Sequence, residues 1–383
     1  MTAQHVLVTG GAGFIGSHIV DALLERGHRV RVLDSLDPQV HGPGADGPPA
    51  YLNPAVEFVR GDVRDADALD RALDGIEVVF HQAAAVGVAQ SMYAIRAYTD
   101  TNVMGTATLL ELIVGRHRDH VRKMVVASSM SIYGEGKYLD PETNEPVRIV
   151  LRDIPQMEAG QWEPVVPGTH RPATPVPCDE LKPLMPTSVY AVNKRDQEEM
   201  VLTTGLAYGI PAVALRYFNV YGPRQALSNP YTGVAAIFSS ALMNGRGPLI
   251  FEDGRQSRDF IHVRDIARAN VLAMDSDAAD YQAINIGTGR PTSILQVARL
   301  LLERLHPDRR DDPQLQPRIV GKYRAGDIRH CYADIARARA LLGFEPSITY
   351  EQGLDELIEW VRTQRPEDKS EQAYRELADR KLV

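Results

Sequence analysis

The stretch that decides the fold reads Val6-Leu7-Val8-Thr9-Gly10-Gly11-Ala12-Gly13-Phe14-Ile15-Gly16. Its apolar start predicts a buried strand, and the apolar residues after the glycines recur at helical spacing, at positions 15, 19, 23 and 24. The glycines allow a tight turn and let a pyrophosphate approach the backbone, where the helix N-terminus adds partial positive charge. The stretch therefore predicts a dinucleotide-binding loop, with Gly10, Gly13, Phe14, Ile15 and Gly16 as cofactor contacts; an ordinary turn is the alternative.

Asp34 favours NAD as the cofactor. It ends a second predicted strand, Arg29–Leu33, about 20 residues beyond the glycines, where a ribose-binding acid is expected. A carboxylate at this place accepts hydrogen bonds from ribose hydroxyls and repels the 2′-phosphate of NADP. We therefore expect NAD rather than NADP.

Further predicted strands, 56–60, 77–81 and 123–127, alternate with helices, one of them near residues 102–114. This alternation indicates an α/β fold, a Rossmann-type doubly wound parallel sheet, and residues just past the strand ends face the ligand crevice in such a sheet. Asp62 could instead cap the next helix, a role that suits Asp65 better. The remaining cofactor contacts are expected to be Asp62, Val63, Gln82, Ala83, Asn102, Tyr190, Lys194 and Phe218.

Composition limits the class of protein. The chain has 383 residues, 44% of them hydrophobic, and a formal net charge of −8, which argues against a nucleic-acid surface. No apolar run is long enough to cross a bilayer, and the first strand begins too early for a secretory signal, so we expect a cytoplasmic protein. Cys178 and Cys331 are isolated in the sequence, which argues against a disulfide framework and against a zinc site.

A candidate catalytic set follows from Pro186–Lys194, which opens a helix with Ser188 as a plausible N-cap. Tyr190 and Lys194 are four residues apart and share one helix face. To act as a base near neutrality, a phenol needs a pKa shift worth roughly 4 kcal/mol, which an ammonium and the positive nicotinamide can supply. Ser129, at the end of the strand that begins at Lys123, would hydrogen-bond the substrate hydroxyl.

These motifs resemble the extended short-chain dehydrogenase/reductase family of nucleotide-sugar epimerases and dehydratases. The resemblance runs from Val6 to about Trp360 and includes the stretches 215–224 and 257–263. It implies that Ser129, Tyr190 and Lys194 are catalytic. It also implies that a nucleotide-diphosphate sugar is bound by Ser129, Ser131, Asn219, Arg258, Arg324 and Asp327. The alternative is that Arg258 and Arg324 only pair with nearby acids.

The residues beside Ser129 indicate the branch of the family. Dehydratases carry an Asp-Glu pair there and decarboxylases a glutamate, whereas this chain has Met130 and Ser131. Oxidation and reduction alone then remain, and we expect a 4-epimerase that forms a transient 4-keto sugar, similar to dTDP-L-rhamnose-type and UDP-glucose 4-epimerases. In the uronate epimerases an arginine tends to occupy the neighbourhood of residues 85–93, whereas Gln90 carries no charge to hold a carboxylate, which favours a dTDP-6-deoxyhexose or a UDP-hexose. A 4-ketoreductase, a UDP-uronate epimerase and a non-enzymatic dinucleotide sensor are the alternatives.

Two domains are expected. The first, residues 1–219 with 260–289, would bind NAD, and the second, residues 220–259 with 290–383, would be a smaller α/β domain that binds the nucleotide sugar. The first contains an insertion at about 139–186, where residues 141–186 hold ten of the 25 prolines. We expect an extended flap that roofs the substrate through Trp162; a dimer contact or a solvent-side loop is the alternative. The segment Asn229–Val234 is expected beside the nucleobase, the charged tail after Pro366 has no assigned role, and a homodimer is expected.

Overall fold

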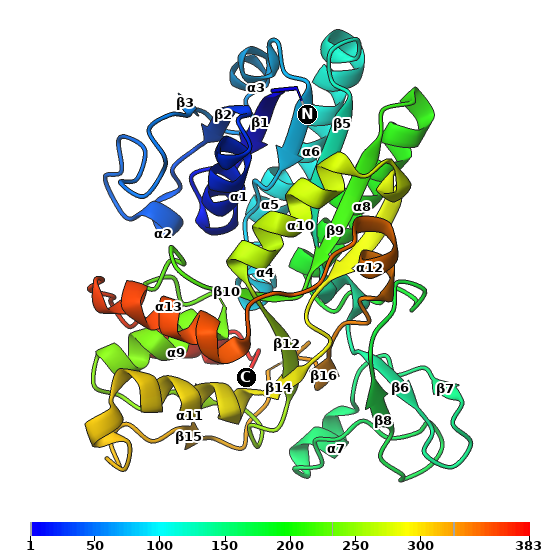
Figure 1. Ribbon diagram of the computed structural model, residues 1–383. Coiled ribbons are helices and arrows are strands. Elements are labelled where there is room, and N and C mark those ends of the chain that lie inside the picture. The colour runs from blue at the N-terminus through cyan, green and yellow to red at the C-terminus, as the bar shows by residue number, and fades with distance from the viewer. Residues whose placement is uncertain (1, 232, 325) are drawn as a thin grey trace.

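The computed structural model describes residues 2–231, 233–324 and 326–383. A seven-stranded sheet with every neighbouring pair parallel forms its centre, and helices cover both faces (Figure 1). The strands, in spatial order, are β13 (Gln282–Ile286), β9 (Ala212–Tyr217), β5 (Lys123–Ser129), β4 (Val78–His81), β1 (His5–Thr9), β2 (Arg29–Asp34) and β3 (Glu57–Arg60). The predicted doubly wound parallel sheet is confirmed.

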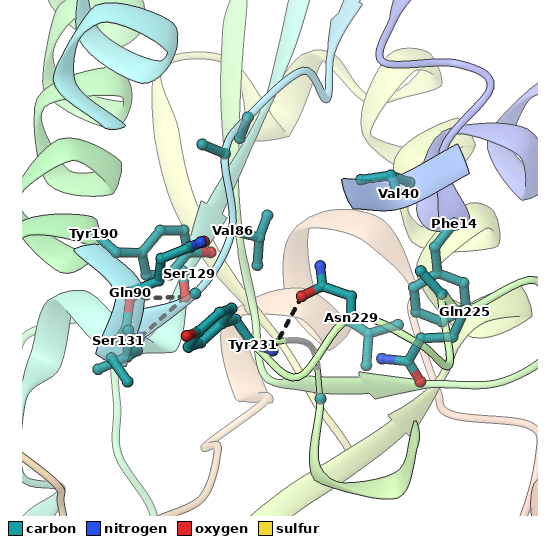
Figure 2. Close-up of a pocket in the computed structure, with 18 of the residues that line it drawn as sticks. Phe14, Val40, Val86, Gln90, Ser129, Ser131, Tyr190, Gln225, Asn229 and Tyr231 are labelled. Atoms are coloured by element: carbon teal, nitrogen blue, oxygen red, sulfur yellow. Dashed lines mark hydrogen bonds between the residues drawn. The ribbon is translucent and has the colours of Figure 1, made fainter. Parts of the chain in front are cut away.

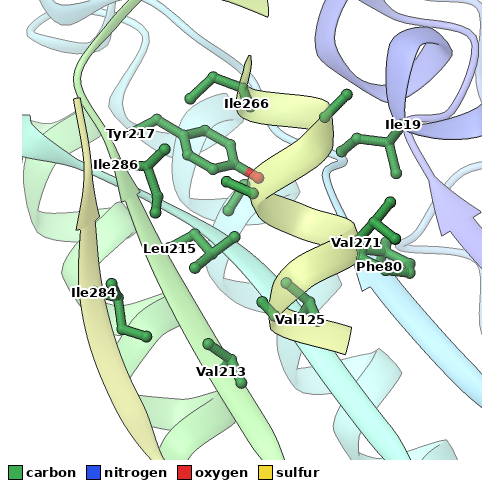
Figure 3. Packing of buried hydrophobic residues seen from close by; sticks show 14 of the residues in the cluster. Ile19, Phe80, Val125, Val213, Leu215, Tyr217, Ile266, Val271, Ile284 and Ile286 are labelled. Atoms are coloured by element: carbon green, nitrogen blue, oxygen red, sulfur yellow. The ribbon is translucent and has the colours of Figure 1, made fainter. Parts of the chain in front are cut away.

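Alternate residues of the central strands feed two separate cores. Val6 and Val8 of β1 pack in the core that α1 (Phe14–Glu25) and α10 (Val263–Asp275) cover. Leu7 points to the opposite core, which contains residues of α3 (Ala66–Leu73), α6 (Gly105–Leu112) and α8 (Val189–Tyr208). Figure 3 shows α10 lying over apolar side chains of β4, β5, β9 and β13. Apolar residues on both faces of the strands are typical of a sheet buried on both sides.

Shorter elements connect these strands and helices. The predicted Asp65 and Ser188 caps are present, since their side chains accept hydrogen bonds from the first turns of α3 and α8. The helix expected near 102–114 is α6 with a π-helical turn at each end, η1 (Asp100–Met104) and η2 (Ile113–His117). The other short elements here are α2 (Pro38–His41), α4 (Val88–Ser91), α5 (Ile95–Thr99), η3 (Met130–Tyr133) and η4 (Asp277–Ala279).

A second, smaller sheet lies beyond the carboxyl ends of the large one (Figure 1). It contains β10 (Asn219–Tyr221), β12 (Ser257–His262), β14 (Pro291–Ser293) and β16 (His330–Cys331). Its apolar core is shared with α9 (Val234–Met243), α11 (Ile294–Leu305) and α13 (Tyr350–Arg362). The remaining elements on this side are β11 (Leu249–Ile250), η5 (Pro307–Arg309), β15 (Arg318–Ile319) and α14 (Ser370–Asp379).

The chain crosses between the two sheets more often than the predicted domain boundaries imply. All of β12, through His262, pairs within the small sheet, and α10 begins at the next residue. In addition, α12 (Ala336–Leu342) contacts β13 and α10, so part of residues 290–383 packs on the large sheet. The two-domain division stays a prediction.

The insertion is a small lobe of its own (Figure 1). Its three short strands, in the order β7 (Pro146–Val147), β6 (Lys137–Leu139) and β8 (Thr174–Val176), form an antiparallel sheet, accompanied by α7 (Ile154–Glu158). Tyr138, Ile149, Val166 and Ala173 form a separate apolar core. The prolines therefore interrupt long elements without preventing an ordered fold.

The two cysteines, isolated in the sequence, are in contact in the structure. Both are buried and free, and a hydrogen bond with Cys178, together with burial, raises the pKa of Cys331 well above its ordinary value. Among the described residues, no three or more His, Cys, Asp or Glu side chains are grouped so as to hold a metal ion. Within the same ranges, no helix has the length and apolar character needed to cross a bilayer.

Candidate active site

A cavity of about 840 Å³ runs along the carboxyl ends of the large sheet and continues to the small one. Nearly all the residues predicted from the sequence line it. They are Gly10, Gly13, Phe14, Ile15, Gly16, Asp34, Asp62, Val63, Gln82, Ala83, Ser129, Ser131, Tyr190, Lys194, Phe218, Asn219, Arg258, Arg324 and Asp327. Figure 2 shows Ser129, Ser131 and Tyr190 together at one side of this cavity and Phe14 at the other.

The glycine loop has the geometry of a pyrophosphate site. Gly10 has a φ of +69°, and a Cβ added there would lie 2.8 Å from the main chain of Ala83. A Cβ on Gly16 would lie 2.2 Å from the Gly10 carbonyl oxygen, so the turn and the helix approach too closely for any side chain. Gly13 caps α1 without a side-chain hydrogen bond, so no side chain competes with a ligand for the first N–H groups. The loop therefore fits the phosphates of a dinucleotide.

Asp34 is held in place at the end of β2. Its carboxylate accepts hydrogen bonds from the Ala12 N–H (3.0 Å) and the Leu36 N–H (2.9 Å), and it is 8% exposed. It lines the cavity and fits the ribose hydroxyls of NAD. Asp62 pairs with Arg64, and the hydrogen bond from Arg64 lowers the Asp62 pKa although burial opposes the shift.

Asn102 is the exception among the predicted cofactor contacts. It is fully buried and does not line the cavity. Its side-chain oxygen accepts a hydrogen bond from the Ala85 N–H (2.8 Å), and its amide donates to the Ala85 carbonyl (3.0 Å). The expectation of a direct contact is thus corrected: Asn102 fixes the loop after β4, whose residues 82–85 do line the cavity.

The proposed catalytic side chains meet where β5 ends and α8 begins. Ser129 Oγ accepts hydrogen bonds from the Ser131 N–H (3.2 Å) and the Ser131 hydroxyl (2.9 Å), and it also shares a hydrogen bond with Tyr190. Lys194 Nζ donates to the Ala127 carbonyl on β5 at 2.9 Å. The Tyr190 N–H donates to Ser91 Oγ at 3.0 Å, which fixes the first turn of α8. These bonds fix Lys194 and the start of α8 beside the end of β5, where Ser129 meets the phenol.

Burial dominates the titration of this set. It raises the pKa of Tyr190 to about 12, with the Ser129 hydrogen bond opposing the rise, and it lowers the pKa of Lys194 to about 7. The acidification of the phenol expected from Lys194 is absent from the protein alone, because the causes of the Tyr190 pKa shift are burial and the Ser129 hydrogen bond and do not include Lys194. A base at Tyr190 thus needs further positive charge close to the phenol.

Polar groups of the small-sheet side face the same cavity. Asn219 Oδ1 is buried and, among the described residues, has no hydrogen-bond partner, as expected of an acceptor that meets a ligand. Arg324 donates to Asp327 Oδ2 from Nε (3.0 Å) and Nη2 (2.8 Å), and Arg258 Nη2 lies 3.9 Å from the same carboxylate. Burial opposes ionisation of Asp327, but Arg324 and Arg258 lower its pKa. The two arginines thus pair with an acid and also line the cavity, so neither interpretation of them excludes the other.

Comparison with known proteins identifies the family. The model described as "NAD dependent epimerase/dehydratase family" matches residues 6–150 and 166–287, more than half of the chain. The chain belongs to this family. The family and the NAD cofactor predicted from the sequence are therefore confirmed.

Characterised relatives of this family member match it over nearly its whole length. It is 36% identical to dTDP-L-rhamnose 4-epimerase of Burkholderia thailandensis over 94% of this chain and 95% of that protein. The structure of UDP-glucose 4-epimerase with UDP-glucose from Thermotoga maritima is similar with a TM-score of 0.74 and 32% identity, covering 94% and 99% of the two chains. The structure of UDP-glucose 4-epimerase from Thermus thermophilus in complex with NAD has a TM-score of 0.72 and 30% identity, and the match covers 94% of this chain and 100% of that chain.

Several residues line the cavity that were not predicted from the sequence. Helix α14 lies in the tail for which the sequence suggested no role, and it lines the cavity through Ala373, Tyr374 and Leu377. Ala373 and Leu377 are buried and four residues apart, and this helical spacing is the signal that could have predicted a packed face. Glu376 Oε2 accepts hydrogen bonds from Tyr93 (3.0 Å) and Tyr231 (2.7 Å). Phe251 also lines the cavity, and the Arg324 guanidinium lies 4.7 Å from its ring centre. Of the segment expected beside the nucleobase, all but Thr232, which is outside the described residues, line the cavity.

The expectation that the insertion roofs the substrate is wrong for this structure. None of the described residues from 139 to 186 lines the cavity. Trp162 does not reach it, and its carbonyl accepts a hydrogen bond from Arg152 inside the lobe. The physical reason is that the lobe has its own core and buried ion pairs, which attach it to residues 327–330 and to Glu252 instead.

Proposed function

We propose that the protein is an NAD-dependent nucleotide-sugar 4-epimerase that inverts C4 through a transient 4-keto sugar. One observation carries this proposal: Ser129, Tyr190 and Lys194 share a single cavity with the glycine loop and with Asn219, Arg258 and Arg324. A ligand with two phosphates needs fixed cationic donors, and an arginine supplies them as a planar fork. The names of the relatives agree with this activity.

Each residue has a distinct task in the proposed reaction. Tyr190 accepts the proton of the sugar O4, and Ser129 hydrogen-bonds the same hydroxyl and orients it. Lys194 anchors the cofactor ribose and favours the ionised phenol. The chemistry that bound NAD supplies is acceptance and later return of the C4 hydride. Arg258, Arg324 and Asn219 hold the diphosphate while the ketone turns to present its other face.

Residues near Ser129 favour epimerisation of an uncharged sugar. Met130 and Ser131 follow Ser129, so the carboxylic acids that dehydration or decarboxylation needs are missing from those positions. Gln90 lines the cavity, and its Oε1 accepts hydrogen bonds from Tyr98 (2.9 Å) and Gln39 (3.0 Å), which leaves a neutral surface. We therefore propose a dTDP-6-deoxyhexose or a UDP-hexose as the substrate rather than a uronate.

The test uses the purified protein without added cofactor. Native mass spectrometry should show bound NAD, and incubation with dTDP-L-rhamnose or UDP-glucose should yield the C4 epimer over many turnovers. A requirement for stoichiometric NADH or NADPH would show a 4-ketoreductase instead. Conversion of UDP-glucuronate alone would assign the protein to the uronate branch.

The oligomeric state and cellular location complete the proposal. Helices α5 and α8 lie in contact, and together with η1 they expose Ile95 (53%), Met104 (54%) and Val192 (42%). Exposed apolar side chains on neighbouring elements support a homodimer, which sedimentation of wild type and of Met104→Asp would test. Two free cysteines in contact support a reducing compartment, and we place the protein in the cytoplasm.

A further inference from the structure

The insertion sends charged side chains into the interior of the protein. Two arginines and three glutamates meet beneath the segment that carries Arg324 and Asp327. We call this group the charge cluster: Glu135, Arg152, Glu163, Glu252 and Arg329, of which Glu163 is 41% exposed and the other four are buried. The side chains of Arg152 and Arg329 are 1% and 0% exposed. Charges this deeply buried are tolerated only when they are paired and hydrogen-bonded.

Arg152 is the main link between the insertion and the cavity wall. Its Nη2 donates to the Asp327 carbonyl (3.0 Å) and lies 2.7 Å from Glu252 Oε1, while its Nε lies 3.4 Å from Glu135 Oε1. Its Nη1 donates to the Trp162 carbonyl (3.1 Å), within the insertion. One guanidinium thus ties the insertion to the main chain at Asp327.

Glu163 forms a second link from the insertion. It accepts hydrogen bonds from Arg329 Nε (3.0 Å) and pairs with His330 Nε2 (2.9 Å). The other ring nitrogen of His330 lies 2.8 Å from the Ser257 hydroxyl, next to Arg258. Residues on both sides of Ile328 are therefore held by side chains of the insertion.

The held segment has little regular structure of its own. Between the end of β15 at Ile319 and the start of β16 at His330, the described residues form no helix or strand. Arg258 supports this segment from the cavity side, because its guanidinium donates to the carbonyls of Ile328 (2.7 Å) and Arg329 (3.0 Å). Arg152, which does not line the cavity, binds the Asp327 carbonyl of the same segment. The places of Arg324 and Asp327 at the cavity thus depend on contacts made behind them.

The strained backbone at Glu252 also indicates that the charged side chains fix the chain beside the cavity. This residue has a φ of +53°, which is unusual for a residue other than glycine, and its buried carboxylate is paired with both Arg152 and Arg329. It directly follows Phe251, which lines the cavity beside Arg324. The same two arginines therefore fix both chain segments on this side of the cavity.

We propose that Arg152 is a positioning residue for the nucleotide-diphosphate part of the substrate. Arg152 holds the Asp327 main chain in place. It thereby also positions the Asp327 carboxylate, which Arg258 faces, and the nearby Arg324, so that both arginines can contact the diphosphate. Glu163 supports the same segment through Arg329 and His330. The inference rests on the proposed function, because it assigns the cavity arginines to the diphosphate.

The experiment compares Arg152→Met with Arg171→Met in the full-length protein with its bound NAD. Arg171 is also a cation of the insertion, but it is 37% exposed, and its ion-pair partners among the described residues are Asp140 and Glu142, so it is the matched control. We expect Arg152→Met to raise KM for the nucleotide sugar, and the calorimetric Kd of UDP and dTDP, at least about tenfold, with kcat within about threefold. NAD content and the control should be unchanged. Arg152→Lys, which keeps the charge but not the fork, should recover part of the affinity.

A second variant covers the case in which Arg152→Met does not fold, since it leaves two buried carboxylates with less compensation. Arg152→Met with Glu135→Gln removes one charge of each sign and should give the same rise in KM and Kd. Wild-type values in a folded variant would overturn the inference, as would an equal loss of NAD and UDP affinity, which marks a purely structural role. Wild-type protein that binds neither UDP nor dTDP would instead overturn the proposed function and this inference together.

Discussion

On the cofactor side of the cavity the surface is formed largely by main chain and strand ends, whereas on the substrate side it depends on arginine and carboxylate side chains. The glycine loop and Asp34 derive from a continuous βαβ unit and interact with close neighbours. Arg324 and Asp327 lie on an irregular segment whose supports come from residue 152 and residue 258. A regular sheet can bind a ligand that is common to the whole family, while side chains on irregular segments can adapt to a particular sugar nucleotide.

Tyr190, between the two sides, should give the largest effect. Tyr190→Phe removes the group that we propose accepts the proton from O4, so kcat should fall by about 100-fold or more while NAD stays bound. Epimerisation assays and NAD content measure the two quantities. Tyr208→Phe is the control, because Tyr208 lies at the far end of the same helix and is 43% exposed. Activity of Tyr190→Phe within threefold of wild type would remove Tyr190 from the chemistry.

On the cofactor side, a substitution that displaces the main chain of the glycine loop should weaken NAD binding. Gly16→Ala places a Cβ against the Gly10 carbonyl, so the NAD content of the purified protein should drop at least about tenfold. Gly115→Ala adds the same methyl group into open space, where no described atom beyond its chain neighbours and its own helix backbone lies within 4 Å, and it should leave NAD content unchanged. Normal NAD content in Gly16→Ala would contradict the close approach of the turn and the helix.

His81, beneath the cofactor loop, should make stability depend on pH. Burial and the charge of Lys194 lower its pKa to about 3, and its ring nitrogens lie within hydrogen-bond distance of Thr9 and Thr106. Between its ordinary pKa of 6.5 and the lowered value of about 3, His81 is protonated in the unfolded chain but neutral in the folded protein. The free energy of unfolding therefore falls as the pH falls through this range, by about 1.4 kcal/mol per pH unit from this group.

Urea unfolding of wild type and His81→Asn at pH 7, 6 and 5 checks this prediction. The advantage of wild type over the variant should shrink by about 2 kcal/mol between pH 7 and pH 5. His18 and His262 also have lowered pKa values, but both proteins contain them, so the difference isolates His81. A constant difference would mean that His81 takes up its proton over the same pH range in the folded protein as in the unfolded chain.

The substrate side should respond more weakly to a change in α14. Glu376→Ala removes the acceptor shared by Tyr93 and Tyr231, and KM for the nucleotide sugar should rise by about three- to tenfold with NAD content unchanged. Asp379→Ala on the same helix is the control, since its side chain is exposed. Equal KM values in the two variants would show that α14 lines the cavity without shaping it.

The same comparison explains what sequence reasoning could and could not find. Gly10, Asp34 and the Tyr190–Lys194 spacing are local patterns whose chemistry follows from the elements that carry them. The Asn102 bond to Ala85, the contact of Cys178 with Cys331 and the role of α14 join residues far apart in the chain. The prolines of the insertion correctly excluded long elements but carried no information about where the lobe would pack. Only the folded chain shows that Arg152 reaches Asp327.

Phe218 alone separates β9, which pairs with the large sheet, from β10, which pairs with the small one. Its N–H still donates to Ile286 on β13 at 3.0 Å, so the strand passes from one sheet to the other without a flexible joint. Any rotation of the two halves at this crossing is therefore confined to the few bonds between the Phe218 N–H and the start of β10. We therefore expect small molecules to enter and leave through local fluctuations at the rim of the cavity, and a dinucleotide to exchange slowly compared with each catalytic cycle.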